Sequence, residues 1–183
     1  GGSGTLPGVV GKARTAPNGY LGFMQGTTWS GASNTAHVDG YVKTYQTGAF
    51  TFPIGDNGSY RPAKVSAASV TNAADAAYYG VNPNSAVTTS LAGGNEPVLP
   101  TGGPFTITSV AGTVNKVQDK EYWDINGTTA ATITLTWNAA SDIATLTTST
   151  LSNLIIVGWN GTQWEEVAST VDATSILGGA STL

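Results

Sequence analysis

The sequence contains no cysteine, which excludes disulfide bonds, thiolate metal sites and thiol nucleophiles. Its single histidine, His37, excludes a zinc site made of several histidines and leaves a Ser-His-Asp triad with one centre and no GxSxG motif. We expect His37 to be exposed or to lie at a strand edge. No P-loop or dinucleotide-binding fingerprint is present either. The residue patterns of the common enzyme classes are missing, so we expect a protein that is not an enzyme.

Charge is also scarce, at 10% of 183 residues, and the net charge is −4. The seven lysines and arginines are scattered along the chain, whereas a surface that binds nucleic acid needs them clustered. No apolar run approaches the roughly 18 residues of a membrane helix. We therefore expect no nucleic-acid partner and no membrane span. Low charge combined with abundant Thr, Gly and Asn favours a secreted or cell-surface protein.

Short β-rich runs, separated by Gly, Pro and Asn, recur along the chain, and helical periodicity is nearly missing. This pattern predicts an all-β fold, a two-sheet antiparallel sandwich that is immunoglobulin-like or jelly-roll-like. We expect residues 1–36 to form an extended N-terminal segment and residues 37–183 to form the sandwich module. Residues 71–80 contain helix-compatible alanines, but a short helix there is the less favoured interpretation. Residues 80–104, rich in Pro, Gly and Asn, are expected to form a long loop or crossover.

Residues 121–137, EYWDINGTTAATITLTW, place two carboxylates around an aromatic pair. In an extended strand, residues three apart point to opposite faces, so Glu121 and Asp124 are separated. Glycosidase chemistry needs two carboxyl groups that face each other about 5 to 9.5 Å apart. An extended strand therefore rules out this pair as a catalytic acid and base.

The Asn126-Gly127 dipeptide predicts that the same segment folds back as a β-hairpin. A two-residue turn would pair Trp123 with Ala130, whereas an irregular turn would shift the register by one residue and send Trp123 inward. We favour the irregular turn because a tryptophan is more stabilising when it is buried.

A second hairpin is predicted in LIIVGWNGTQWEEV, residues 154–167, where β-like sequence flanks Asn160-Gly161. A two-residue type I′ turn would pair Val157 with Trp164 and would put both tryptophans of the hairpin on one face, diagonal to each other. LIIVGW is apolar on both faces, which predicts a central strand of a sheet that is covered on both sides.

The tryptophans are open to two interpretations. We favour a buried or sheet-covering cluster for Trp159 and Trp164. The alternative is an aromatic platform for a sugar ring, with Trp123, Trp159 and Trp164 as the candidate stacking residues. Two or more coplanar tryptophans open to solvent would favour sugar binding.

Two turn sequences, GDNGS at residues 55–59 and DING at residues 124–127, offer side-chain oxygens that suit calcium. Neither is followed by the further carboxylates of a calcium loop, so tight Asn-Gly turns are the favoured explanation. We expect no cofactor, with calcium as the alternative. Arg61 is expected to act as a structural clamp, stacking on Tyr60 or pairing with a carboxylate such as Asp56.

Three blocks carry a resemblance to a known class of proteins: residues 37–62 (HVDGYVKTYQTGAFTFPIGDNGSYRP), residues 121–138 (EYWDINGT with TLTWN) and residues 151–167 (LSNLIIVGWNGTQWEEV). Their content and order are similar to the recurring blocks of Bacteroidota cell-surface and secreted proteins. Many of those proteins are exported by the type IX secretion route, and they include adhesin-like and gliding-associated proteins. The resemblance implies a β-rich extracellular module without an established catalytic set.

These observations together predict a non-catalytic structural or adhesive module, a subunit of a surface filament or part of a multi-module adhesin. Its expected partners are neighbouring copies or modules of the same surface protein, which would meet through strand edges. The alternative is a carbohydrate-binding module that takes polysaccharide on exposed tryptophans.

Overall fold

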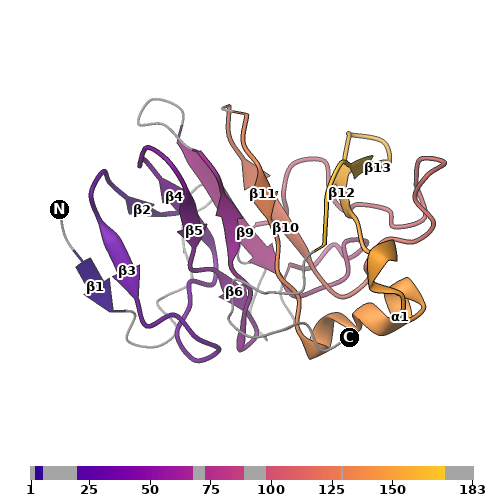
Figure 1. Ribbon diagram of the computed structural model, residues 1–183, viewed down its shortest axis with the longest axis horizontal. Coiled ribbons are helices and arrows are strands. Elements are labelled where there is room, and N and C mark those ends of the chain that lie inside the picture. Colours follow the sequence, from indigo (N-terminus) through magenta and orange to yellow (C-terminus); the bar gives the residue numbers. More distant parts are fainter. Residues whose placement is uncertain (1–2, 6–19, 68–72, 89–97, 129, 172–183) are drawn as a thin grey trace.

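The computed structural model describes residues 3–5, 20–67, 73–88, 98–128 and 130–171, and every structural statement below concerns these residues. The chain consists of short strands in several sheets with very little helix (Figure 1). The prediction of an all-β sandwich is confirmed, and the sheets do not close into a barrel. No helix in this part of the chain is long and apolar enough to cross a membrane.

Two sheets form the body of the sandwich. The larger has the strand order β10-β9-β4-β2, in which β2 runs parallel to β4 and the other neighbours are antiparallel. The smaller has the antiparallel order β11-β8-β5. The bounds are β2 Tyr20–Phe23, β4 Tyr41–Thr44, β5 Phe50–Phe52, β8 Ala63–Val65, β9 Ala74–Tyr79, β10 Tyr122–Asn126 and β11 Ile133–Thr134.

Three further strand pairs and three short helices complete the described fold. The strand pairs are β1 (Ser3–Thr5) parallel to β3 (Thr28–Ser30), β6 (Gly55–Asp56) with β7 (Ser59–Tyr60), and β12 (Ile156–Trp159) with β13 (Trp164–Val167). The helices are η1 (Ala139–Ser141), α1 (Ile143–Thr147) and η2 (Leu151–Asn153). The sequence pattern did not predict these helices.

The four-stranded sheet is buried on both faces, and its central strand β9 shows how. Ala76 and Tyr78 point into a first core that lies against the three-stranded sheet. Ala77 and Tyr79 point into a second core, which the connection before β10 and the β12-β13 hairpin cover. Alternate side chains of β9 thus serve different cores, as the two-residue period of a strand requires. The helix considered for residues 71–80 is not formed, since residues 74–79 are strand.

The doubly covered central strand is therefore β9 and not the LIIVGW stretch. Residues 156–159 of that stretch form β12, which belongs to a two-stranded sheet and is only half-buried. The prediction of a central strand there is wrong: Val157 and Trp159 pack on the second core, and among the described residues β12 has β13 as its one strand partner. The small alanines of β9 did not signal its central position.

The boundary predicted between residues 36 and 37 does not separate two structural units. Strand β2, which precedes that boundary, pairs with β4, and Phe23 lies in the first core. Residues 6–19, in the predicted N-terminal segment, lie outside the described residues. In the described parts of residues 80–104 there is no strand, in agreement with a long connection between β9 and β10.

Asn126-Gly127 does not close a hairpin. Strand β10 pairs with β9, and β11 pairs with β8, so the chain crosses from one sheet to the other after residue 127. The hairpin prediction is wrong because β9 offers β10 a partner of six residues, whereas β11 has only two. Trp123 nevertheless points inward and packs on the first core, as the favoured alternative predicts.

The turn between β6 and β7 is the tight Asn-Gly turn that the sequence indicates. Asn57 and Gly58 have φ angles of 58° and 74°, the values of a type I′ turn, and Asp56 pairs with Ser59. Of the two turn sequences considered for calcium, this one is explained by hairpin geometry.

We expect Gly58→Ala to lower the free energy of unfolding by about 1–2 kcal/mol, because a Cβ disfavours positive φ. Gly112→Ala is the matched control: the space around its Cβ is also empty, but its φ does not lie in the positive region. Urea denaturation of both variants measures the difference. Equal midpoints for the two variants would contradict the assignment of this turn.

Candidate functional site

The most concentrated polar constellation in the described chain is a buried ion pair between Arg61 and Glu121. The two side chains are 0% and 5% exposed. The Arg61 Nε donates a hydrogen bond to Glu121 Oε2 at 2.9 Å, and Nη2 donates to both carboxylate oxygens. Arg61 follows β7 and Glu121 precedes β10, so the pair joins two of the sequence blocks. The predicted clamp is present, but the partner of Arg61 is Glu121 and not Asp56.

Aromatic and hydroxyl groups enclose the pair. Tyr78 Oη donates to Glu121 Oε2 at 2.7 Å, and Arg61 Nη2 donates to Ser141 Oγ. The indole Nε1 of Trp123 donates to the Arg61 carbonyl at 3.1 Å, and the guanidinium carbon lies 5.7 Å from the ring centroids of Tyr78 and Trp123. Burial, followed by the negative charge of Glu121, raises the pKa of Tyr78. Arg61 Nε and Nη2, the Glu121 carboxylate and the hydroxyl of Tyr78 thus bond within the cluster, whereas the buried Arg61 Nη1 has no hydrogen-bond partner among the described residues.

Asp124 belongs to a separate network on the opposite face of the sheet. Its Oδ2 accepts hydrogen bonds from Tyr41 Oη at 2.5 Å and from Asn126 Nδ2 at 3.0 Å. Asn126 also donates to Asp75, whose carboxylate lies 3.7 Å from the Lys43 ammonium. Burial raises the pKa of Tyr41, and the charge of Asp124 adds to the shift. The prediction that strand geometry separates Glu121 from Asp124 is confirmed.

His37 is buried, with 1% of its surface exposed, so the expectation of an exposed or edge histidine is wrong. Its Nδ1 lies 3.1 Å from the Ser33 carbonyl, and Gly55 packs so closely that a Cβ there would lie 2.9 Å from the ring. Within the described residues no group of three or more His, Asp and Glu side chains could hold a metal ion. The expectation of no cofactor, with calcium as the alternative, stays a prediction.

The second hairpin has a four-residue loop and not the predicted two-residue turn. Trp159 pairs directly with Trp164, and Asn160 N donates to the Gln163 carbonyl at 3.0 Å. The Asn160 side chain accepts from the backbone N–H groups of Thr162 and Gln163, each at 3.0 Å. This side-chain cap stabilises the wider loop, which is why the register differs from the predicted one.

The two hairpin tryptophans pack edge-to-face, with ring centroids 5.6 Å apart and ring planes at 67°. Trp164 is 7% exposed, and Phe105 contacts both rings. Trp123 is half-buried, with Tyr78 and Arg61 against its ring. The three candidate stacking residues thus present no shared flat surface, which favours the structural interpretation. Sugar stacking stays a prediction.

The Arg61–Glu121 pair was not predicted from sequence. Both residues stand in blocks that were singled out, YRP and EYW, and the scarcity of charge made each of them conspicuous. Their pairing depends on the sheet topology, which the sequence pattern left open. The two side chains are buried, so the pair does not face solvent.

We expect Glu121→Gln to destabilise the fold by about 3–5 kcal/mol, because it leaves the buried guanidinium of Arg61 without its counter-charge. Glu166→Gln, at an exposed position of β13, is the control and should change stability by less than about 0.5 kcal/mol. Urea denaturation followed by circular dichroism measures both. A loss for Glu121→Gln no greater than that of the control would show that the pair does not hold the fold.

We expect soluble oligosaccharides, tested with cello-, xylo- and chito-oligosaccharides, to leave the tryptophan fluorescence unchanged, because Trp164 is buried and Trp159 meets it edge-on. Free N-acetyltryptophanamide in the same solutions controls for bulk effects. A saturable change in emission that disappears in Trp159→Ala would instead establish the sugar platform.

No protein-family model, no curated protein and no solved structure matches this chain. Its function must therefore be argued from its own geometry.

Proposed function

We propose that this chain is a non-catalytic structural or adhesive module of the cell exterior, which assembles with neighbouring copies or modules through its strand edges. The observation that carries the proposal is the open sandwich: among the described residues, β10 and β2 each pair with a strand on one side only. Such edges leave backbone N–H and C=O groups ready to pair with an added strand.

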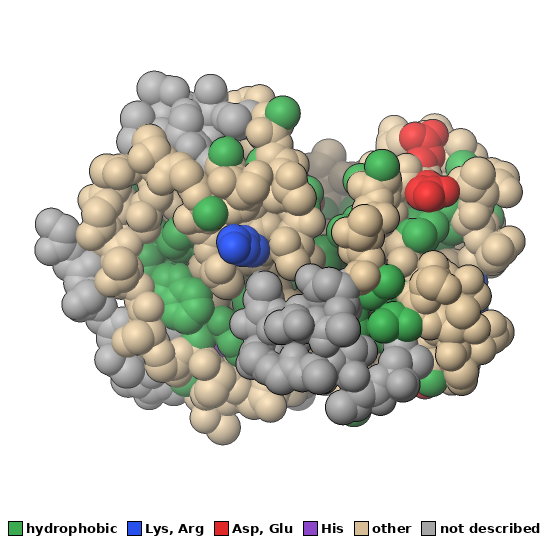
Figure 2. All heavy atoms as spheres, in the orientation of Figure 1, with side chains coloured by type: hydrophobic (Ala, Val, Ile, Leu, Met, Phe, Trp, Pro, Cys, Tyr) green, Lys and Arg blue, Asp and Glu red, His purple; other side chains and the backbone are tan. Residues whose placement is uncertain are grey.

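The β2 edge lacks the features that prevent association, whereas β10 carries one charged residue, Asp124. Proteins commonly block an edge with lysine, proline or a bulge. Strand β2 has no charged residue or proline, and the exposed fractions of Tyr20, Leu21 and Met24 are 45%, 38% and 58%. Figure 2 shows a face with few charged side chains, where acidic groups gather over the β12-β13 hairpin. An association through such edges would depend on backbone pairing and apolar contact more than on charge.

The arrangement of the polar groups supports a role without catalysis. The carboxylates of Glu121 and Asp124 accept hydrogen bonds from other side chains of the protein, and they lie on opposite faces of the sheet. A general acid or base must reach a substrate, whereas Glu121 is enclosed by Arg61 and Tyr78. These groups contribute to the fold.

The extracellular assignment rests on the resemblance to Bacteroidota surface proteins. The YRP and EYW blocks, far apart in the sequence, meet in one buried cluster around Arg61 and Glu121. Residues that build such a cluster are the ones that a recurring structural module would keep together. This supports treating the blocks as the signature of a module and not of a reaction centre.

We expect sedimentation velocity to show concentration-dependent association of the intact chain, and negative-stain microscopy to show rods or filaments. Because edge pairing involves little charge, raising the salt from 0.05 to about 0.5 M should change the association by less than about threefold. A chain that remains monomeric up to millimolar concentration would contradict the proposal. Association that disappears in high salt would point to a charged interface instead.

A further inference from the structure

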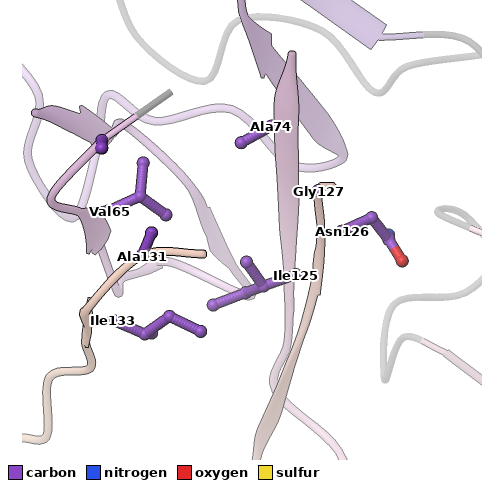
Figure 3. A pocket seen from close by; sticks show the side chains of 8 residues that line it. Val65, Ala74, Ile125, Asn126, Gly127, Ala131 and Ile133 are labelled. Atoms are coloured by element: carbon purple, nitrogen blue, oxygen red, sulfur yellow. The ribbon is translucent and has the colours of Figure 1, made fainter. Parts of the chain in front are cut away.

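An apolar groove opens between the two main sheets at the crossover from β10 to β11 (Figure 3). Ile125 and Ile133 point toward each other across it, and the Asn126 side chain is turned away. The groove is open to one side and has a volume of about 120 Å³, room for one aliphatic side chain. Its apolar lining residues are Val65, Ala67, Ala74, Ile125, Ala131 and Ile133.

The groove exists because the two sheets end unevenly. Strand β11 is the edge of one sheet and β10 is the edge of the other, and no described strand lies beyond β10 to cover β11. Ile133 is consequently 38% exposed, although its side chain points toward the core side chain Ile125. An additional strand beside β10 would cover Ile133 and would also satisfy the backbone groups of the β10 edge.

We propose that residues 172–183 of a second copy add as a strand to the edge of β10 and place an aliphatic side chain in this groove. This inference rests on the proposed function, since it names the edge and the segment through which copies assemble. The side chain would pack between Ile125 and Ile133.

The choice of segment follows from its length and composition. Twelve residues, 172–183, follow the last described residue, and they could span roughly 40 Å when extended. After Asp172 they carry no charge, and they include Ile176, Leu177 and Leu183. The N-terminal stretch fits less well because it carries Lys12 and Arg14, and because β1 already pairs with β3.

A second copy is the expected donor because of where the segment starts. Residues 168–171 follow β13, and Trp164 of β13 packs in the second core, on the opposite face of the four-stranded sheet from the groove. A segment of the same molecule would have to pass around the β10 edge to reach the groove, whereas a segment from a neighbouring molecule would not. Since donor segment and groove are different surfaces, the contact is heterologous and each copy can both give and receive a strand, which builds an open chain of subunits or a closed ring.

The test uses two full-length variants that each remove one side of the contact. Ile133→Asp places a charge in the groove, and the double variant Ile176→Asp/Leu177→Asp places charges in the segment. We expect each to associate about ten- to a hundredfold more weakly than the unaltered chain, because an aliphatic side chain loses its burial. Leu21→Asp places the same charge at the other open edge, β2, where the side chain is also 38% exposed, and should leave this association unchanged because the contact uses β10. Melting temperatures verify that all variants are folded.

A mixture of the two variants gives the sharpest outcome. The groove of the double variant is intact, and so is the segment of Ile133→Asp, so the mixture should form a one-to-one complex that neither variant forms alone. A fluorescent peptide of residues 172–183 should bind the double variant and not Ile133→Asp, and a peptide of residues 6–16 should bind neither.

Other outcomes would overturn the inference. Unchanged association in both variants, or a loss confined to Leu21→Asp, would overturn it and leave assembly through strand edges standing. Binding of the 6–16 peptide in the groove would assign the contact to the other end of the chain. A lower melting temperature of the double variant that does not depend on concentration would mean that the segment docks on its own molecule. A chain that never associates would overturn the inference together with the proposed function.

Discussion

The buried ion pair between Arg61 and Glu121 is the constraint on which the rest of the sandwich depends. In a chain with little charge, both ions lie away from solvent and meet in a bidentate contact through Arg61 Nε and Nη2. Removing two charges from water is costly, and a well-packed apolar pair would often be as stable. The pair holds two distant segments together, the residue before β10 and the residue after β7. The hydrogen bond from Arg61 to Ser141 attaches the short helix η1 to the same cluster.

The position of Glu121 determines which side chains of β10 face each core. With Glu121 held toward Arg61, the alternation of a strand sends Trp123 and Ile125 to the first core and Tyr122 to the second. Tyr122 stacks on Tyr79 of β9 with centroids 4.6 Å apart, while Trp123 packs against Tyr78. One polar contact therefore sets the register of the aromatic residues in both cores, and a slip by one residue would bury Asp124 among apolar side chains.

The sequence predicted correctly those features of the fold that depend on local geometry alone. The β content, the separation of Glu121 from Asp124 and the turn at Asn57-Gly58 depend only on residue period and positive φ. The strand partners could not be predicted in the same way. Strand β10 pairs with β9, across a connection of more than forty residues, and not with β11, which is nearer in the sequence. The Arg61–Glu121 pair depends on that long-range choice. The predicted register of the tryptophan hairpin was wrong for a different reason: the Asn160 side chain caps a wider loop than the one predicted.

The parallel pairing of β2 with β4 has a mechanical consequence. Residues Tyr20 to Phe23 lie beside Tyr41 to Thr44 in the same direction, so the N-terminal end of β2 and the C-terminal end of β4 are at opposite ends of the ladder. Tension applied between the two termini of the chain would load all of these hydrogen bonds together, along the strands, and would not open them one by one as in a hairpin. A molecule held under tension would resist extension at this junction, and its lifetime under load would be set by the rate of that collective rupture.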